Sequence, residues 1–216
     1  MRPMARSRLP RPVRKQPNRY HHGDLRRALL QEAVRTIHAQ GVEGLTLRAV
    51  GEKLGVSRTA LYRHFADKSA LLAAVAGEGF RLFRVELLAA WKQGANAREG
   101  FEAMGVAYVR FAIRNPSHYR VMFGGFVEVE ATDPDLVRES TGAFQVLVDA
   151  LVAQQQQGLV RQEEPQQLAR FIWAVVHGVA MLAIDGQLQH QSADPENLTR
   201  YAVARLRTGI APATQA

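Results

Sequence analysis

Apolar residues recur along most of the chain at the three- to four-residue spacing of amphipathic helices. The first such stripe is formed by Leu25, Leu29, Ala33 and Ile37. We expect order to begin near Gly23-Asp24, with Asp24 as a candidate N-cap, because four prolines interrupt the first 20 residues. Gly41 is expected to end this first helix, as a glycine in the left-handed conformation often does.

Two short helices are predicted next. One runs from about Thr46 to Leu54 and ends at Gly55, and the other opens with Ser57 as N-cap and Val56 as a candidate hydrophobic staple. Only two residues separate the end of the second helix from the cap of the third. Two short helices joined through a glycine turn are typical of a helix-turn-helix.

The third predicted helix lies within "GVSRTALYRHF" (55–65) and has two unlike edges. Leu61 and Phe65 share one apolar edge, whereas Arg58, Thr59, Tyr62 and Arg63 occupy the other, with His64 at the border. The apolar edge is expected to pack on the first two helices. The polar edge then suits the major groove of DNA, where donors, acceptors and cations read base edges. The alternative is an ordinary amphipathic helix with a solvated polar face.

The remainder of the chain also reads as helices, which favours an all-α fold with a helical-bundle C-terminal domain. Three of the later helices begin with an acidic residue followed by proline, which is a favoured residue at the first helical position. The expected ranges are 68–91, 97–114, a short helix ending at Gly124-Gly125, 134–157, 165–188 and 195–208.

The helix expected at 165–188 is apolar nearly all round in its middle, so more than one side must be covered. Its run "FIWAVVHGVAMLAI" (171–184) is 14 residues long, too short to span a bilayer. Gly178 in mid-helix suggests close approach of another helix, because glycine there costs about 1 kcal/mol relative to alanine. A second subunit can supply that helix, and a well-packed monomer core is the alternative.

Charge is distributed unevenly. The first 68 residues carry 15 basic and 5 acidic side chains, whereas the other 148 residues have a net charge of −2. A basic N-terminal third indicates a polyanionic partner, either nucleic acid or an anionic membrane surface. Seven of the basic residues fall within residues 1–20, which read either as a flexible DNA-contacting arm or as a merely solvated tail.

Composition and motifs argue against several other functions. The chain has no cysteine, so disulfides and thiolate-ligated metals are excluded. The N-terminus has no apolar stretch of the kind found in secretion signals, so a cytoplasmic location is expected. No phosphate-binding loop, G-x-S-x-G or H-E-x-x-H motif occurs. We therefore expect no catalytic residues, no metal site and no cofactor, and His21-His22 alone make a poor metal site.

The segment "LTLRAVGEKLGVSRTALYRHFADKSALL" (45–72) resembles the N-terminal domain of the tetracycline-repressor (TetR) family of bacterial regulators. "NPSHYRVMF" and "WAVVHGVAMLA" resemble a group of the family's C-terminal domains that carries a Trp and a His-Gly pair in a late helix. The resemblance implies a basic arm (1–22), a DNA-binding domain (23–75), a ligand-binding and dimerisation domain (76–210) and a tail (211–216). Dimerisation is implied through the helices near 165–188 and 195–208.

The resemblance also implies the residues that contact double-stranded DNA. Positions matching base contacts are Arg58, Thr59 and Ala60, and positions matching backbone or mixed contacts are Thr46, Arg48, Tyr62, His64 and Lys68. Physical chemistry supports two of them independently. Arg58 can form a bidentate pair with guanine. Lys68 follows Asp67, the expected N-cap of the fourth helix, so a phosphate there would meet both an ammonium and the backbone N–H groups of the helix start.

A regulator of this family usually senses a small molecule in its C-terminal domain. The candidate lining residues are Met104, Tyr108, Phe111, Met122, Phe123, Trp173, His177 and Met181. Each of them is also an ordinary core residue by type and spacing. The ligand is expected to be small and mainly apolar.

The sequence therefore predicts a DNA-binding transcriptional regulator, in particular a repressor released from a palindromic operator by such a ligand. A non-specific architectural DNA-binding protein without a sensor is the alternative. A peripheral membrane protein fits less well, because no apolar face adjoins the basic arm, and no membrane association is expected.

Overall fold

The computed structural model describes residues 22–127 and 133–210, and within these ranges the regular elements are all helices. The predicted all-α fold is thereby confirmed. The helices are α1 (His22–Gln40), α2 (Leu47–Leu54), α3 (Arg58–Tyr62), α4 (Lys68–Gln93), α5 (Ala97–Arg114), α6 (Pro116–Phe123), α7 (Pro134–Gln156), α8 (Pro165–Ile184) and α9 (Pro195–Ile210), with a 3₁₀ turn at Gln189–Gln191. Residues 1–21 of the predicted arm (1–22) and the predicted tail (211–216) lie outside the described residues, and His22, the last residue of that arm, begins α1.

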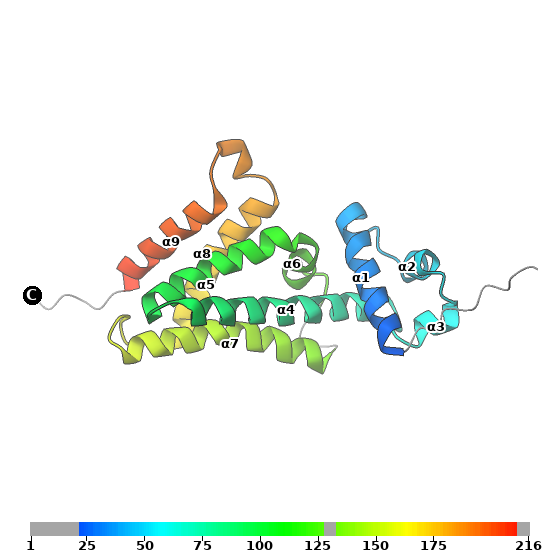
Figure 1. Ribbon diagram of the computed structural model, residues 1–216, viewed down its shortest axis with the longest axis horizontal. Coiled ribbons are helices and arrows are strands. Elements are labelled where there is room, and N and C mark those ends of the chain that lie inside the picture. Colours follow the sequence, from blue (N-terminus) through cyan, green and yellow to red (C-terminus); the bar gives the residue numbers. More distant parts are fainter. Residues whose placement is uncertain (1–21, 128–132, 211–216) are drawn as a thin grey trace, which may run out of the picture.

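Helices α1, α2 and α3 form the N-terminal unit at one end of the molecule (Figure 1). Gly41 and Gly55 both have left-handed backbone conformations, with φ of 75° and 65°, as their predicted roles at helix ends require. The hydroxyl of Thr46 caps α2, and that of Ser57 caps α3 by accepting from the Ala60 amide at 3.2 Å. Asp24 is not the N-cap of the first helix, because α1 begins earlier, at His22.

The third helix is shorter than its sequence pattern suggested. It ends after Tyr62, and the amides of His64 and Phe65 then both bond to the Leu61 carbonyl in a tight turn. The next helix starts only a few residues later, at the Asp67 cap, so the chain has no room for another α-helical turn. Phe65 is nevertheless buried beside Leu61, and the predicted apolar edge persists across the turn.

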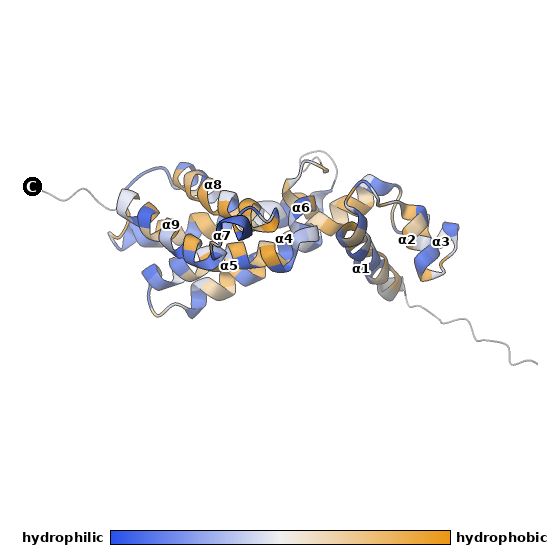
Figure 2. Ribbon diagram, turned by 90° about the horizontal axis from the view of Figure 1, so that it is seen from above, coloured by the Kyte–Doolittle hydropathy of each residue, from blue (hydrophilic) through white to orange (hydrophobic). Residues whose placement is uncertain are grey.

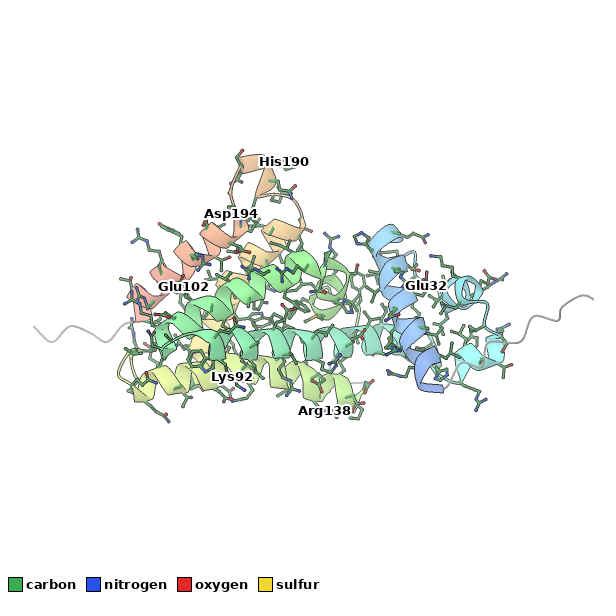
Figure 3. The ribbon with its side chains drawn as sticks, in the orientation of Figure 1. Glu32, Lys92, Glu102, Arg138, His190 and Asp194 are labelled. Carbon is green, nitrogen blue, oxygen red and sulfur yellow. The ribbon has the colours of Figure 1, made fainter. Side chains whose placement is uncertain are left out.

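A buried polar cluster fixes α2 against α1. The Glu32 carboxylate lies between these helices (Figure 3), 3.2 Å from Lys53 Nζ and 3.1 Å from Arg35 Nη1. Burial by itself would raise the pKa of Glu32, but the hydrogen bonds from Arg35 and Lys53 outweigh it and lower that pKa. Lys53 also donates to the Thr36 hydroxyl at 3.2 Å.

The longest helix, α4, joins the two halves of the molecule. It starts beside α1 and runs through the C-terminal domain, where α5, α6 and α7 pack on it (Figure 1). Its Asp67 cap accepts from the Ala70 amide at 2.8 Å. Helix α6 also contacts α1, so the N-terminal unit meets the C-terminal domain through both α4 and α6.

The C-terminal domain is a bundle of α4 to α9. A bidentate ion pair between Arg110 and Glu196, with both N–O distances at 2.8 Å, joins α5 to α9. Arg200 on α9 also donates to Glu102, which Figure 3 places on α5 facing α9. The predicted starts at Pro134, Pro165 and Pro195 are confirmed.

Two predicted helix ends differ from the structure. The helix expected at 165–188 ends at Ile184 because Gly186 adopts a left-handed conformation, with φ of 73°. The last helix continues to Ile210, two residues beyond the expected 208, and Ile210 is buried. Burial of that last turn accounts for its extension.

Candidate DNA-binding surface and ligand pocket

The polar edge of α3 is open to solvent, as a groove-reading surface requires. Arg58, Thr59 and Tyr62 are exposed, and Ala60 is half-buried. The Arg58 guanidinium lies over the Tyr62 ring, 5.5 Å from its centroid. This cation–π contact holds the arginine on the outer face of the helix. Helices α2 and α3 together form the far end of the molecule (Figure 1).

The predicted backbone-contacting residues surround α3, and three of them have partners within the chain. The Thr46 hydroxyl accepts from the Ala49 amide at 3.1 Å, and Arg48 pairs with Glu52 at 2.7 Å while remaining largely exposed. Lys68 Nζ donates to the Glu43 carbonyl at 3.3 Å. An ammonium has three donors, so this bond positions Lys68 at the start of α4 and leaves donors for a phosphate.

His64 is half-buried and lies just beyond α3. The eight predicted DNA-contacting residues therefore lie on α2 or α3, directly beside these helices, or, for Lys68, at the start of α4, and the structure brings them to one end of the molecule. None of these positions is a core position. Their contacts with DNA stay a prediction.

A cavity of about 540 Å³ lies inside the C-terminal bundle, with walls from six helices, α4 to α9. Its volume is in the usual range for sites of drug-sized ligands. The lining residues are Phe80, Phe83, Leu87, Phe101, Met104, Gly105, Tyr108, Met122, Phe123, Ser140, Thr141, Ala143, Phe144, Leu147, Ile172, Trp173, Val176 and Val203. Thr141 is exposed, and its neighbours at the rim are half-buried, which places the mouth beside α7.

Five of the eight residues predicted for the pocket line this cavity, namely Met104, Tyr108, Met122, Phe123 and Trp173. The other three do not. Phe111 is fully buried against Phe83, with ring centroids 5.0 Å apart, and is a core residue. Met181 is half-buried on α8 away from the lining, and His177 lies behind the wall, bonded to tyrosines.

The polar groups at the inner wall form one closed cluster. Trp173 Nε1 donates to the Tyr108 hydroxyl at 2.8 Å, and the Tyr119 hydroxyl lies 3.0 Å from the same oxygen. His177 Nδ1 lies 2.7 Å from the Tyr119 hydroxyl and 3.1 Å from that of Tyr108. The cluster joins α5, α6 and α8 on one side of the cavity.

Burial keeps this cluster uncharged. It raises the pKa of Tyr108 and of Tyr119 well above the ordinary phenol value, although the Trp173 and Tyr119 hydrogen bonds oppose the rise at Tyr108. Burial also lowers the pKa of His177, so the neutral imidazole is the favoured form. The cluster therefore presents neutral rather than charged groups on this side of the cavity.

Several lining residues gave no functional signal in the sequence. Ser140, Thr141 and Leu147 on α7 face the cavity from a helix whose pattern is that of an ordinary amphipathic helix. Phe80, Phe83 and Leu87 on α4 show the i, i+3, i+7 spacing of a buried face. That spacing identified them as buried but carried no information on which helices they would face.

Helices α4 and α6 cross closely at Gly79. A Cβ atom added at this position would lie 2.6 Å from Met122 Sδ and 3.2 Å from His118 Cβ. The absence of a side chain therefore lets α6 approach α4 next to the cavity that Met122 lines. His118 Nε2 also lies 3.5 Å from Glu78 Oε2 across the same crossing, and this contact lowers the pKa of Glu78.

The outer faces of α8 and α9 expose large apolar side chains in the single chain. Phe171, Leu182 and Tyr201 have exposed fractions of 54%, 45% and 60%, and the apolar character of α8 is visible in Figure 2. A side chain at Gly178 would meet no atom of its own chain within 4 Å. Among the described residues, α8 is long and apolar enough to cross a membrane by length and composition, and its other face packs on α5, α7 and α9.

Comparison with known proteins identifies both halves of the chain. Residues 29–75 match the family of bacterial regulatory proteins called the tetR family, and residues 101–206 match the tetracyclin repressor-like C-terminal domain. The tetracycline repressor protein class C of Escherichia coli is 47% identical over 51 residues, or 24% of this chain. That match spans only 23% of the repressor's length.

Two further similarities extend over most of the chain. The HTH-type transcriptional regulator RutR of Escherichia coli strain K12 is 31% identical over 157 residues, covering 69% of this chain and 70% of RutR. A solved structure of a protein of unknown function from Rhodococcus sp. RHA1 is 31% identical and superposes with a TM-score of 0.80, covering 90% of this chain and all of that one. The chain belongs to the TetR family, whose members are DNA-binding transcriptional regulators rather than enzymes.

Proposed function

We propose that the protein is a homodimeric, cytoplasmic repressor that binds a palindromic DNA operator and leaves it when a small, mainly apolar ligand fills the C-terminal cavity. One observation carries this proposal. Helix α4 begins with Lys68 at the predicted DNA surface and supplies Phe80, Phe83 and Leu87 to the cavity wall. A single rigid element thus touches both sites.

The assignment of DNA contacts follows from exposure and charge. Arg58, Thr59 and Tyr62 form an exposed polar edge on a helix whose other edge is buried. In a helix-turn-helix this edge enters the major groove, with Arg58 placed for a bidentate contact to guanine. Thr46, Arg48, His64 and Lys68 flank it at positions suited to phosphates.

The proposed dimer uses the outer faces of α8 and α9. Phe171, Val175, Gly178 and Leu182 follow one another at helical spacing on α8, and Phe171 and Leu182 are exposed in the single chain. Gly178 has open space in front of it, which a second helix can occupy at short distance. An exposed apolar stripe of this kind marks a protein interface, and two-fold pairing is the commonest closed assembly.

Communication between the sites is proposed to run through α4 and α6. A ligand against Met122 and Phe123 on α6 presses on the crossing at Gly79, and both helices contact α1. In a dimer, a small tilt of α4 changes the separation of the two α3 helices, and packed interfaces convert shifts of this kind into discrete states.

The residues "WAVVHGVAMLA" also lead us to place the C-terminal domain in the group of the family with a Trp and a His-Gly in this helix.

Selection of bound fragments from random duplex DNA tests the proposal. A dimer with two α3 helices in successive major grooves should recover an inverted repeat with half-site centres about 10 bp apart or a simple multiple of that. Nothing in the comparisons favours the alternative of a non-specific architectural protein. That alternative nevertheless has its own outcome here, because recovery of no motif would support it and refute the repressor.

A further inference from the structure

We propose that the cavity selects an uncharged, ring-bearing ligand, which enters rings first, keeps its polar group beside α7 and is preferred over an anion of the same shape. This inference rests on the proposed function only in taking the cavity as the effector site. The proposed ligand is thus not only mainly apolar but also uncharged and ring-bearing.

The described walls of the cavity carry no charged side chain. Among the described residues, the 18 that line the cavity include no Asp, Glu, Lys, Arg or His. The nearest acid along α7 is Glu139, and its oxygens lie 3.2 Å from Arg84 Nη2 and 3.3 Å from Arg138 Nη2. Arg84 packs against Gly142 beside the lining but is already paired with Glu139. A sulfonate or carboxylate held within these walls would therefore lose its hydration without gaining an unpaired counter-charge, which is strongly unfavourable.

The polar side chains of the inner wall already have hydrogen-bond partners. The Tyr108 hydroxyl already has three partners, at 2.8, 3.0 and 3.1 Å, and one hydroxyl can satisfy about three. The indole N–H of Trp173 is used in the same cluster. An apolar part of the ligand is therefore the group that fits against this wall, since a polar group there would have to break an existing bond.

The other two hydroxyls of the lining lie on α7. Ser140 and Thr141 line the cavity on α7, and Thr141 is exposed at the mouth. Ser140 donates to the Val137 carbonyl at 3.1 Å and keeps acceptor capacity, whereas no hydrogen bond within the described chain involves the Thr141 side chain. The polar end of the ligand is accordingly expected at the α7 side.

The interior of the cavity is rich in aromatic rings. Phe80, Phe83, Phe123, Phe144 and Trp173 all face the cavity, and aromatic pairs gain from edge-to-face and offset contacts beyond simple burial. The same rings could in principle attract a cation. With no carboxylate in the wall, a cation also lacks a counter-charge, so the neutral ligand is preferred over both ionic forms.

Two fluorescent dyes with the same ring system test this selection. N-phenyl-1-naphthylamine is uncharged, and 8-anilino-1-naphthalenesulfonate adds one sulfonate to the same rings. The full chain should bind the neutral dye at least about tenfold more tightly. Ethidium supplies the cationic arm and should also bind more weakly than the neutral dye.

Variants at the mouth provide the matched control. Thr141→Lys places an ammonium at the rim and should reduce the ratio of the dissociation constants of the anionic and neutral dyes by about tenfold, because an added counter-charge stabilises the bound sulfonate. Gln145→Lys adds the same charge at an exposed position of α7 outside the lining and should leave the ratio unchanged. Both positions are exposed, so neither substitution disturbs the core.

The proposal is overturned if the anionic dye or ethidium binds the unsubstituted protein as tightly as the neutral dye, if none of the three binds, or if the two lysine variants behave alike. These measurements need no DNA. Failure of the repressor model would appear separately, as absence of a selected operator, and would leave the dye preference intact.

Discussion

Replacing Gly79 with alanine should damage the packing of α4 on α6 next to the cavity. The added Cβ would lie 2.6 Å from Met122 Sδ, 3.0 Å from Met122 Cγ and 3.2 Å from His118 Cβ. The end of the methionine side chain can rotate away, but the His118 Cβ is fixed to the backbone of α6. Relief of that contact therefore requires a small displacement of the helix itself.

A matched control exists two residues away on the same helix. A Cβ at Gly77 would meet only the Leu136 Cα, at 3.9 Å, which is ordinary contact. Gly77→Ala should raise the free energy of unfolding by about 0.5–1 kcal/mol, because alanine favours the helix. Gly79→Ala gains the same helix preference but suffers overpacking of about 1–3 kcal/mol, so it should be less stable than Gly77→Ala by about that amount.

Chemical unfolding of both variants, followed by circular dichroism and by tryptophan fluorescence, measures the difference. Coincidence of the two signals establishes whether a two-state free energy can be assigned, and the denaturant midpoints can be compared in any case. Gly79→Ala should also change the affinity for N-phenyl-1-naphthylamine, since Met122 lines the cavity. Equal midpoints for the two variants, with equal dye affinity, would show that the close crossing at Gly79 has no energetic consequence.

Three further predictions concern the DNA surface, the buried histidine and the dimer. Arg58→Ala should flatten the base preference at one base pair per half-site, whereas Lys68→Ala should lower the affinity for all duplexes alike and reduce the slope of log affinity against log salt by about 2 for a dimer. Competition binding at several salt concentrations separates the two effects. A change of base preference in Lys68→Ala would refute its phosphate role. The lowered pKa of His177 means that the unfolded chain takes up a proton that the folded chain resists, so His177 should reduce stability as the pH falls below about 6.5. His177→Asn, which keeps an acceptor near the Nδ1 position, should unfold with a smaller pH dependence between about pH 7.5 and pH 5.5, and an unchanged slope would contradict the assignment. Leu182→Glu places a charge in the proposed α8 interface and should shift the chain toward monomer in analytical ultracentrifugation, whereas an unaltered dimer would move the interface elsewhere.

Local chemistry made much of the fold predictable. Ser57 and Asp67 are N-caps by residue type, and Pro134, Pro165 and Pro195 follow acidic residues at helix starts, so each signal acts within one turn of the chain. Ends were harder to predict. The 165–188 helix stops early because Gly186 turns left-handed, although an apolar leucine two residues later made the helical pattern look continuous.

The cavity could be predicted only in part. Apolar spacing marks Phe111 and Tyr108 equally as buried residues of α5, but only Tyr108 faces the cavity. The difference depends on which helices surround α5, and helical periodicity carries no information about that. For the same reason Thr141 and Leu147 gave no signal, because they become pocket residues only when α7 packs across α4.

The central claim is that the cavity and the DNA surface are energetically coupled, and the most direct test is to measure ligand affinity with and without bound operator. A ligand found by thermal-shift screening, with the selected operator as DNA, should bind the operator complex about 5- to 150-fold more weakly than the free protein. Operator affinity must fall by the same factor when the ligand is saturating, because the coupling is reciprocal. Equal ligand affinity in the presence and absence of operator would contradict the account.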